Sequence, residues 1–140
     1  MATRSTITVK TNRLTVHLYR HWDGYPECTG RHLAWAMNNL ESLSAEELVG
    51  TLITAKEGQP FGSGRYEFTT RASDHGDTEW HYEITLHHRE EPKVEVWHRP
   101  IGESYFLAFN APLHGYRKWM AGRMRTFIAR IKQMMAERAA

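Results

Sequence analysis

Two histidines and an aspartate near the start of the chain have the types and spacing that could bind a metal ion. His17 and His21 are four residues apart in an expected strand, so their side chains share one face, and Asp23 follows in the next turn. Imidazoles and a carboxylate suit Zn, Fe or Ni, and an open coordination position could activate water for hydrolysis. The spacing fits no established metal template, and Asp23 beside Gly24 also suits a tight turn. We therefore predict no metal and no other cofactor, with a metal-dependent hydrolase as the weakest alternative.

Two further groups of side chains could do chemistry. Cys28 lies near an expected helix N-terminus, where the helix dipole lowers a thiol pKa, and His32 follows one turn later. A Cys–His nucleophile also needs an orienting group and an oxyanion hole, and the sequence names neither. His81 with Glu83 and Glu95 could form a polar sheet face that binds an acidic group or a metal, although a solvated face is the simpler interpretation. No Gly-x-Ser-x-Gly motif is present, so we predict a non-enzymatic protein.

Basic residues are concentrated near the end of the chain. Residues 113–140 hold seven Lys and Arg and one Glu, whereas the other 112 residues hold eleven basic and fifteen acidic side chains. Arg117, Arg125 and Lys132 are eight and seven residues apart, with Lys118 adjacent, so a helix would place them on one stripe. Such a stripe could neutralise nucleic-acid phosphates, or a basic helix could pack against its own acidic body.

Apolar and aromatic residues favour a different interpretation, a protein interface. Met134 and Met135 lie near the end of the basic segment, and Met adapts to irregular contacts in a partner or homodimer surface. Trp22 and Tyr25 flank Asp23 in the Asp-Gly turn, where they could be exposed anchors or could pack the turn. We predict that the partner-binding residues are Trp22, Asp23, Tyr25, Arg117, Lys118, Arg125 and Lys132.

Hydrophobic periodicity predicts the elements that position these residues. Alternation of apolar and polar residues indicates strands, and three- and four-residue steps indicate helices. Ser44 with Glu47 three residues later forms a capping-box pattern, which predicts the start of a helix. The expected strands are 5–10, 14–21, 65–71, 79–88, 93–99 and 103–110, and the expected helices are 28–40, 44–58 and 114–138.

These elements predict an α+β fold. We expect an antiparallel β-sheet of about five or six strands, covered by two short helices and a long amphipathic C-terminal helix. The single domain spans 1–140, with an N-terminal hairpin and two helices in 1–58, a β-meander in 65–110 and the basic helix in 113–138.

Composition agrees with one soluble domain. The chain has 140 residues, of which 41% are hydrophobic and 24% charged, enough for one core. A single cysteine excludes an internal disulfide and a Cys-cluster zinc site. No apolar run approaches a membrane span and no signal peptide opens the chain, so we expect no membrane partner and a cytoplasmic location.

Two N-terminal motifs carry a family resemblance. The opening Met1-Ala-Thr-Arg-Ser-Thr-Ile7 precedes Tyr19-Arg-His-Trp-Asp-Gly-Tyr-Pro26 and Gly30, and Asp77-Thr-Glu-Trp-His-Tyr82 follows later. Together these segments resemble a group of small bacteriophage and prophage proteins that begin Met-(Gly/Ala)-Thr-Arg-Ser and run a strand into an aromatic-Asp-Gly-Tyr turn. The resemblance covers roughly the first 40 residues and implies a phage or prophage origin, in a host cytoplasm, without implying any chemistry.

Origin, size and charge segregation together predict the function. We expect a non-enzymatic phage or prophage accessory protein that binds a host protein, such as an inhibitor of a bacterial defence system of the anti-CRISPR kind. The main alternative is a nucleic-acid-binding protein that uses residues 117–132.

Overall fold

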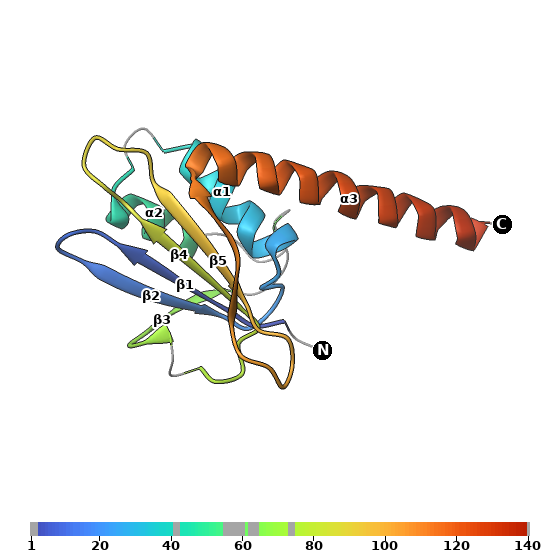
Figure 1. Ribbon diagram of the computed structural model, residues 1–140, viewed down its shortest axis with the longest axis horizontal. Coiled ribbons are helices and arrows are strands. Elements are labelled where there is room, and N and C mark those ends of the chain that lie inside the picture. Colours follow the sequence, from blue (N-terminus) through green and yellow to red (C-terminus); the bar gives the residue numbers. More distant parts are fainter. Residues whose placement is uncertain (1–2, 41–42, 55–60, 62–64, 73–74, 140) are drawn as a thin grey trace.

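A computed structural model describes residues 3–40, 43–54, 61, 65–72 and 75–139. Six strands form one sheet, and the helices gather on one side of it (Figure 1). The α+β class is therefore confirmed. In chain order the elements are β1 (Ser5–Lys10), β2 (Thr15–Arg20), a π-helical turn η1 (Pro26–Gly30), α1 (Arg31–Asn38), α2 (Ala45–Ile53), β3 (Tyr66–Thr69), β4 (Trp80–Thr85), β5 (Lys93–His98), β6 (Phe106–Pro112) and α3 (Leu113–Ala139).

The sheet is mixed, which corrects the prediction of an antiparallel sheet. Its strand order is β3-β2-β1-β4-β5-β6, and β1 pairs with β4 in parallel while all other neighbours are antiparallel. The predicted meander over 65–110 is also wrong at its first strand, because β3 pairs with β2 at the far edge. Only β4, β5 and β6 form a meander.

One face of the sheet is apolar and carries the core. Strand register places Ile7 beside Leu18 and Tyr82, and Tyr82 beside Val96, all within 1% of full burial. The helices α1 and α2 and the beginning of α3 cover this face with apolar side chains such as Leu33. We call the opposite side of the sheet the open face. Along β4 and the first part of β5 its residues alternate with the core residues, as the two-residue period of a strand requires.

The predicted helices are confirmed with changed ends. Ser44 caps α2, because its Oγ accepts a hydrogen bond from the Glu47 amide at 3.1 Å. Residues 28–40 divide into η1 and α1, since Pro26 opens the segment with a wider turn. Residues 55–58 of the predicted second helix lie outside the described part of the chain. No helix in the described residues is long and apolar enough to cross a bilayer.

Candidate protein-interaction surface

The long helix α3 is fixed to the body at its first turns. The Tyr116 hydroxyl is buried and donates to the Gly30 carbonyl at 2.6 Å, and burial raises the pKa of that phenol. Met120 packs on the same glycine so closely that a Cβ there would lie 2.7 Å from the methionine methyl group. The lack of a side chain at Gly30 therefore lets α3 approach η1.

Arg123 is the last strong contact between α3 and the body. Its guanidinium bonds Glu27 Oε1 through Nε and Nη2, each at 2.9 Å, and the Glu27 side chain is only 13% exposed. The same guanidinium lies 5.1 Å from the ring centre of Trp119 and 5.7 Å from that of Trp80. A partly buried, charge-assisted contact with aromatic neighbours is stronger than an exposed ion pair.

Glu91 closes the N-terminus of α3. Its Oε1 accepts from the His114 amide at 2.6 Å, and its Oε2 lies 2.8 Å from His114 Nδ1. These hydrogen bonds lower the pKa of the Glu91 carboxyl. A negative charge at this end also complements the helix dipole, so the direction of α3 is set where it leaves β6.

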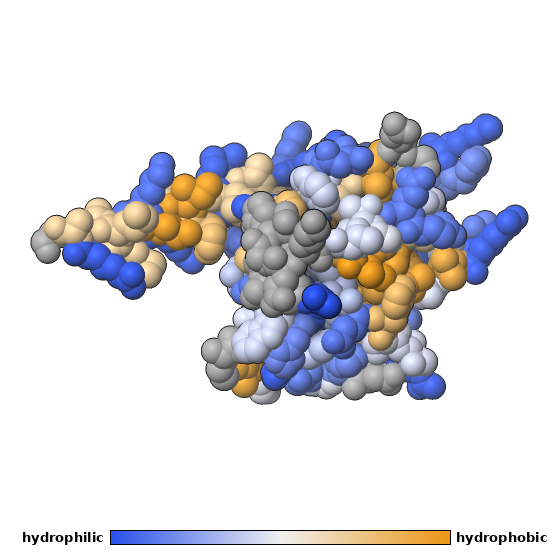
Figure 2. Space-filling model, turned by 180° about the vertical axis from the view of Figure 1, so that it is seen from behind, coloured by the Kyte–Doolittle hydropathy of each residue, from blue (hydrophilic) through white to orange (hydrophobic). Residues whose placement is uncertain are grey.

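Beyond Met124, which still packs against the core, the helix projects into solvent (Figure 1). From residue 125 onward only Phe127 among the described residues is even partly covered. Ile128 is 46% exposed, Ile131 40%, Met134 53% and Met135 65%. Figure 2 shows hydrophobic surface along the projecting arm, with hydrophilic surface beside it.

The exposed apolar residues form one continuous surface. Phe127, Ile128, Ile131, Met134 and Met135 recur at steps of three and four, which places them on one side of the helix, and we call them the distal stripe. Helical spacing continues this stripe from the buried positions Leu113, Tyr116 and Met120. The distal stripe therefore prolongs the face that packs against the body, and all of its residues except the partly covered Phe127 are exposed.

Basic residues border the distal stripe on both sides. Lys118, Arg125 and Lys132 are seven residues apart on one side, and Arg123 and Arg130 are seven residues apart on the other. The structure leaves all four predicted helix cations, Arg117, Lys118, Arg125 and Lys132, exposed. Lys118 and Arg130 also border a hollow of about 480 Å³ between η1 and α3, whose apolar lining includes Trp119 and Phe127.

The Asp-Gly turn contains only one strongly exposed aromatic. Trp22 is 49% exposed and contacts His21 edge-on at 4.8 Å. Asp23 has a positive φ of 54°, and its carbonyl accepts from Thr29 Oγ1 at 2.9 Å. Tyr25 packs against the core, and burial raises the pKa of its phenol. Among the described residues, Trp22 makes no hydrogen bond or ring contact with α3.

The metal candidates do not come together. His17 Nδ1 is hydrogen-bonded to Thr8 Oγ1 at 2.8 Å, whereas His21 Nδ1 faces the Tyr19 hydroxyl at 3.2 Å and Arg4 Nε at 3.3 Å. No group of three or more His, Cys, Asp or Glu in the described chain is arranged to hold a metal ion.

The Cys28 candidate lacks the activated state that it would need. Burial is the main cause that raises the thiol pKa, so the nucleophilic thiolate is disfavoured. His32 Nδ1 pairs with the Tyr66 hydroxyl at 3.0 Å, which commits that nitrogen to the core.

The carboxylates near His81 are already paired. Glu83 bonds Lys10 Nζ at 2.6 Å, and Lys10 keeps the pKa of this carboxyl low although burial acts to raise it. Glu95 lies 3.6 Å from Lys93 and accepts from Trp97 Nε1 at 3.2 Å. His81 itself faces Thr6, and burial lowers the pKa of the imidazole. The predicted polar face exists, but its two carboxylates are held by lysines.

Comparison with known proteins finds no matching family model, no similar curated protein and no similar solved structure.

Proposed function

We propose that this chain is a non-enzymatic protein-binding module and that the distal stripe, with its basic borders, is the binding surface. The observation that carries the proposal is that α3 extends its core-facing stripe beyond the body, where five apolar side chains meet solvent. Its 27 residues span about 40 Å at 1.5 Å per residue. An exposed contiguous apolar surface on a soluble domain is typical of an interaction site.

The charges around the stripe support one kind of partner. Lys118, Arg125 and Lys132 on one side and Arg130 on the other present positive charge along the whole apolar seam. A complementary partner is an amphipathic helix with an apolar stripe and acidic borders, because opposite charges speed encounter and fix register. A second copy of α3 would bring like charges together. The proposed occupant is therefore a different protein.

The resemblance of the N-terminal motifs to phage proteins supports a host protein as that partner. We include in the proposal an inhibitory role against a bacterial defence component, which would have to present the acidic amphipathic helix. This part rests on the resemblance and on the charge pattern of α3, and its target is identified by the experiment below.

A designed peptide tests the surface directly. The probe is a labelled helical peptide with a Leu stripe and Glu borders, and its counterpart carries Lys borders. We expect the Glu peptide alone to bind by fluorescence anisotropy. Ile131→Gln should weaken it about tenfold, the equivalent of 1.4 kcal/mol, whereas Ala129→Gln on the far side of α3 should not. Equal effects of the two variants, or equal binding of the two peptides, would overturn the proposal.

A pull-down then identifies the natural partner. The intact chain and its Ile131→Gln variant are compared as bait in nuclease-treated host lysate, at two salt concentrations. A stoichiometric protein that the variant loses, and that contains an acidic amphipathic helix, would supply the target. A defence component among such proteins would support the inhibitory role, and one of another class would contradict it.

Nucleic-acid binding is the second candidate function, and the regular spacing of Lys118, Arg125 and Lys132 favours it specifically. Cations along one helix side could contact successive phosphates. If this function is correct, the double variant Arg125→Glu/Lys132→Glu loses binding to a 20-base-pair duplex, and affinity falls steeply from 50 to 200 mM salt. If duplex binding is unaffected by the double variant and by the increase in salt, the helix does not contact the phosphates.

A further inference from the structure

A hollow of about 380 Å³ lies on the open face, across the sheet from the helix layer. It is floored by Thr6 and His81 and walled by Trp97 and Tyr105, with Ala72 from the preceding loop above. Register explains its position. Tyr19, Thr6, His81 and Trp97 form one row across β2, β1, β4 and β5, and the small threonine leaves a low point between larger side chains.

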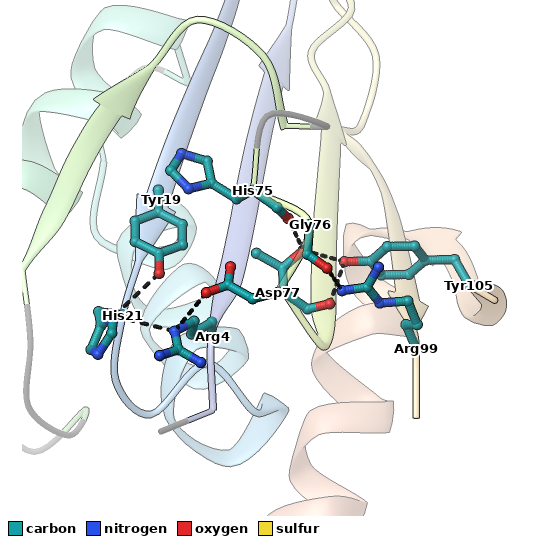
Figure 3. A network of polar contacts seen from close by, with 9 residues as sticks. Arg4, Tyr19, His21, His75, Gly76, Asp77, Arg99 and Tyr105 are labelled. Atoms are coloured by element: carbon teal, nitrogen blue, oxygen red, sulfur yellow. Dashed lines mark hydrogen bonds and ion pairs between the residues drawn. The ribbon is translucent and has the colours of Figure 1, made fainter. Parts of the chain in front are cut away.

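Two described residues before β4, His75 and Thr78, are held in place beside this row. His75 stacks on Tyr19 with ring centres 3.9 Å apart, and its Nε2 is hydrogen-bonded to Thr69 Oγ1 at 2.9 Å. On the other side the Tyr105 hydroxyl donates to the Thr78 carbonyl at 2.9 Å. Figure 3 shows His75 beside Tyr19 and Tyr105 beside Arg99, with Gly76 between them. The walls are therefore preformed.

The lining includes one arginine, Arg99, which carries a positive charge. Arg99 and two histidines line the hollow, and none of the described lining residues is Asp or Glu. The nearby Asp77 is bound to Arg4 at 3.0 Å. Arg99 donates through Nη2 to the Gly76 carbonyl, and its guanidinium lies 5.1 Å from the Tyr105 ring centre. A guanidinium has five N–H donors, so the others can take a carboxylate.

The floor adds one polar contact. His81 Nδ1 is hydrogen-bonded to Thr6 Oγ1 at 2.8 Å, and no partner for Nε2 is found among the described residues. The indole N–H of Trp97 is held by Glu95, so its ring offers the ligand an apolar face. Aromatic walls of this kind favour a planar ring, and a few convergent polar groups orient it.

We propose that this hollow is a binding site for a small planar aromatic carboxylic acid, either free or at the end of a peptide. The ring lies against Trp97 and Tyr105, the carboxylate meets Arg99, and His81 Nε2 contacts a polar ring substituent. The site lies on the open face and shares no residue with the distal stripe, so it stands independently of the proposed protein-binding function.

Three small probes distinguish recognition of a carboxylate from non-specific hydrophobic binding. Indole-3-acetate, indole and tryptamine present the same ring with negative, neutral and positive charge. In an amide NMR titration we expect indole-3-acetate to shift the signals of Thr6, His81, Trp97 and Tyr105, and to bind at least tenfold more tightly than tryptamine. Equal affinity for the three probes, or no shifts at these positions, would overturn the proposal.

Two variants locate the site. Arg99→Gln should weaken indole-3-acetate at least tenfold and leave indole unchanged, whereas Arg71→Gln, an exposed arginine outside the lining, should change neither. Ala72→Phe fills the hollow from the loop and should abolish binding of every probe. Thermal unfolding of each variant confirms folding. Retained affinity in folded Arg99→Gln or Ala72→Phe would show that the ligand binds elsewhere.

Discussion

At the scale of single residues, His32 is a histidine that the fold keeps neutral. It is 1% exposed, stacks on Phe61 at 4.7 Å between ring centres, and hydrogen-bonds the Tyr66 hydroxyl. Burial, with a smaller contribution from Arg20, lowers its pKa to about 4, against 6.5 for the free side chain. The unfolded chain therefore binds a proton between these values while the folded chain does not.

This difference makes stability depend on pH in one direction. His32 contributes no penalty above pH 6.5, and stability falls as the pH drops from 6.5 toward 4. Between pH 7 and pH 5 we expect the free energy of unfolding to lose about 2 kcal/mol through this group. Urea unfolding of the parent and of His32→Gln measures it. The variant should lose less on acidification, and His87→Gln, at an exposed position, should behave as the parent.

Arg123 is predicted to help hold α3 to the body, together with Tyr116 and Met120. Arg123→Ala removes both contacts to Glu27 Oε1 and the contacts with Trp80 and Trp119, and should cost about 1–3 kcal/mol. Arg125→Ala, two residues along the same helix, is exposed and should stay within about 0.5 kcal/mol. Chemical denaturation measures the free energy of unfolding of both variants. Similar losses of stability would mean that the charge of the helix, and not the contact between Arg123 and Glu27, determines the effect.

The sequence predicted how side chains are arranged only where the residues lie close together along the chain. Helical spacing predicted that Arg117, Arg125 and Lys132 share one stripe with Lys118 adjacent, but it left open whether that stripe is exposed, as the structure shows it to be. The hollow floored by Thr6 and His81 was missed, because these residues are 75 positions apart and meet only through the register of β1 and β4.

At the scale of elements, two glycines have opposite roles. A Cβ at Gly30 would lie 2.7 Å from the Met120 methyl and 2.9 Å from the Tyr116 hydroxyl, whereas Gly50 in α2 faces open space. We expect Gly30→Ala to destabilise by about 1–3 kcal/mol and Gly50→Ala to stabilise by about 0.5–1 kcal/mol. Thermal unfolding measures both effects, as a lower midpoint for Gly30→Ala and a higher midpoint for Gly50→Ala. A stable Gly30→Ala protein would contradict the close packing of η1 on α3.

The projecting end of α3 is predicted to add nothing to the stability of the body. Residues 128–139 are exposed throughout and border no core side chain. Removing residues 128–140 should leave the midpoint of thermal unfolding unchanged, whereas Met120→Ala should lower it, at a cost of about 2–5 kcal/mol. A large loss on truncation would mean that the end packs on the body after all.

The sequence predicted which segments form helices and strands, but it did not predict which strands pair with each other. Alternation predicted the β1–β2 hairpin and β4, and the three- and four-residue steps predicted α3. The segment at Tyr66–Thr69 was assigned to its neighbour in sequence, because a turn-rich stretch before Trp80 favoured a hairpin. The residues of β3 themselves do not indicate whether this strand pairs with the next strand in sequence, β4, or with the earlier strand β2.

At the scale of the whole molecule, charge is divided between an acidic body and a basic arm. Residues 113–140 carry seven basic side chains and one acidic one, and the rest has an acidic excess. The basic borders of the distal stripe should keep two arms apart, so we expect a monomer by sedimentation at 50 mM salt. Salt screens such repulsion, so self-association should increase at 1 M. A dimer at low salt would contradict the assignment of the stripe to a different protein.

The parallel pairing of β1 with β4 has a consequence for how the chain is made. β1 and β2 are synthesised almost together, but His81, the partner of Thr6 in β4, is 75 residues further along the chain. Synthesis of those residues takes about 4–15 s at ~5–20 residues per second. During that interval the strand that will stand at the centre of the sheet has an unsatisfied backbone edge, which invites pairing with other chains. We therefore expect translation speed and chaperone supply to affect the yield of soluble protein, in addition to the stability of the finished fold.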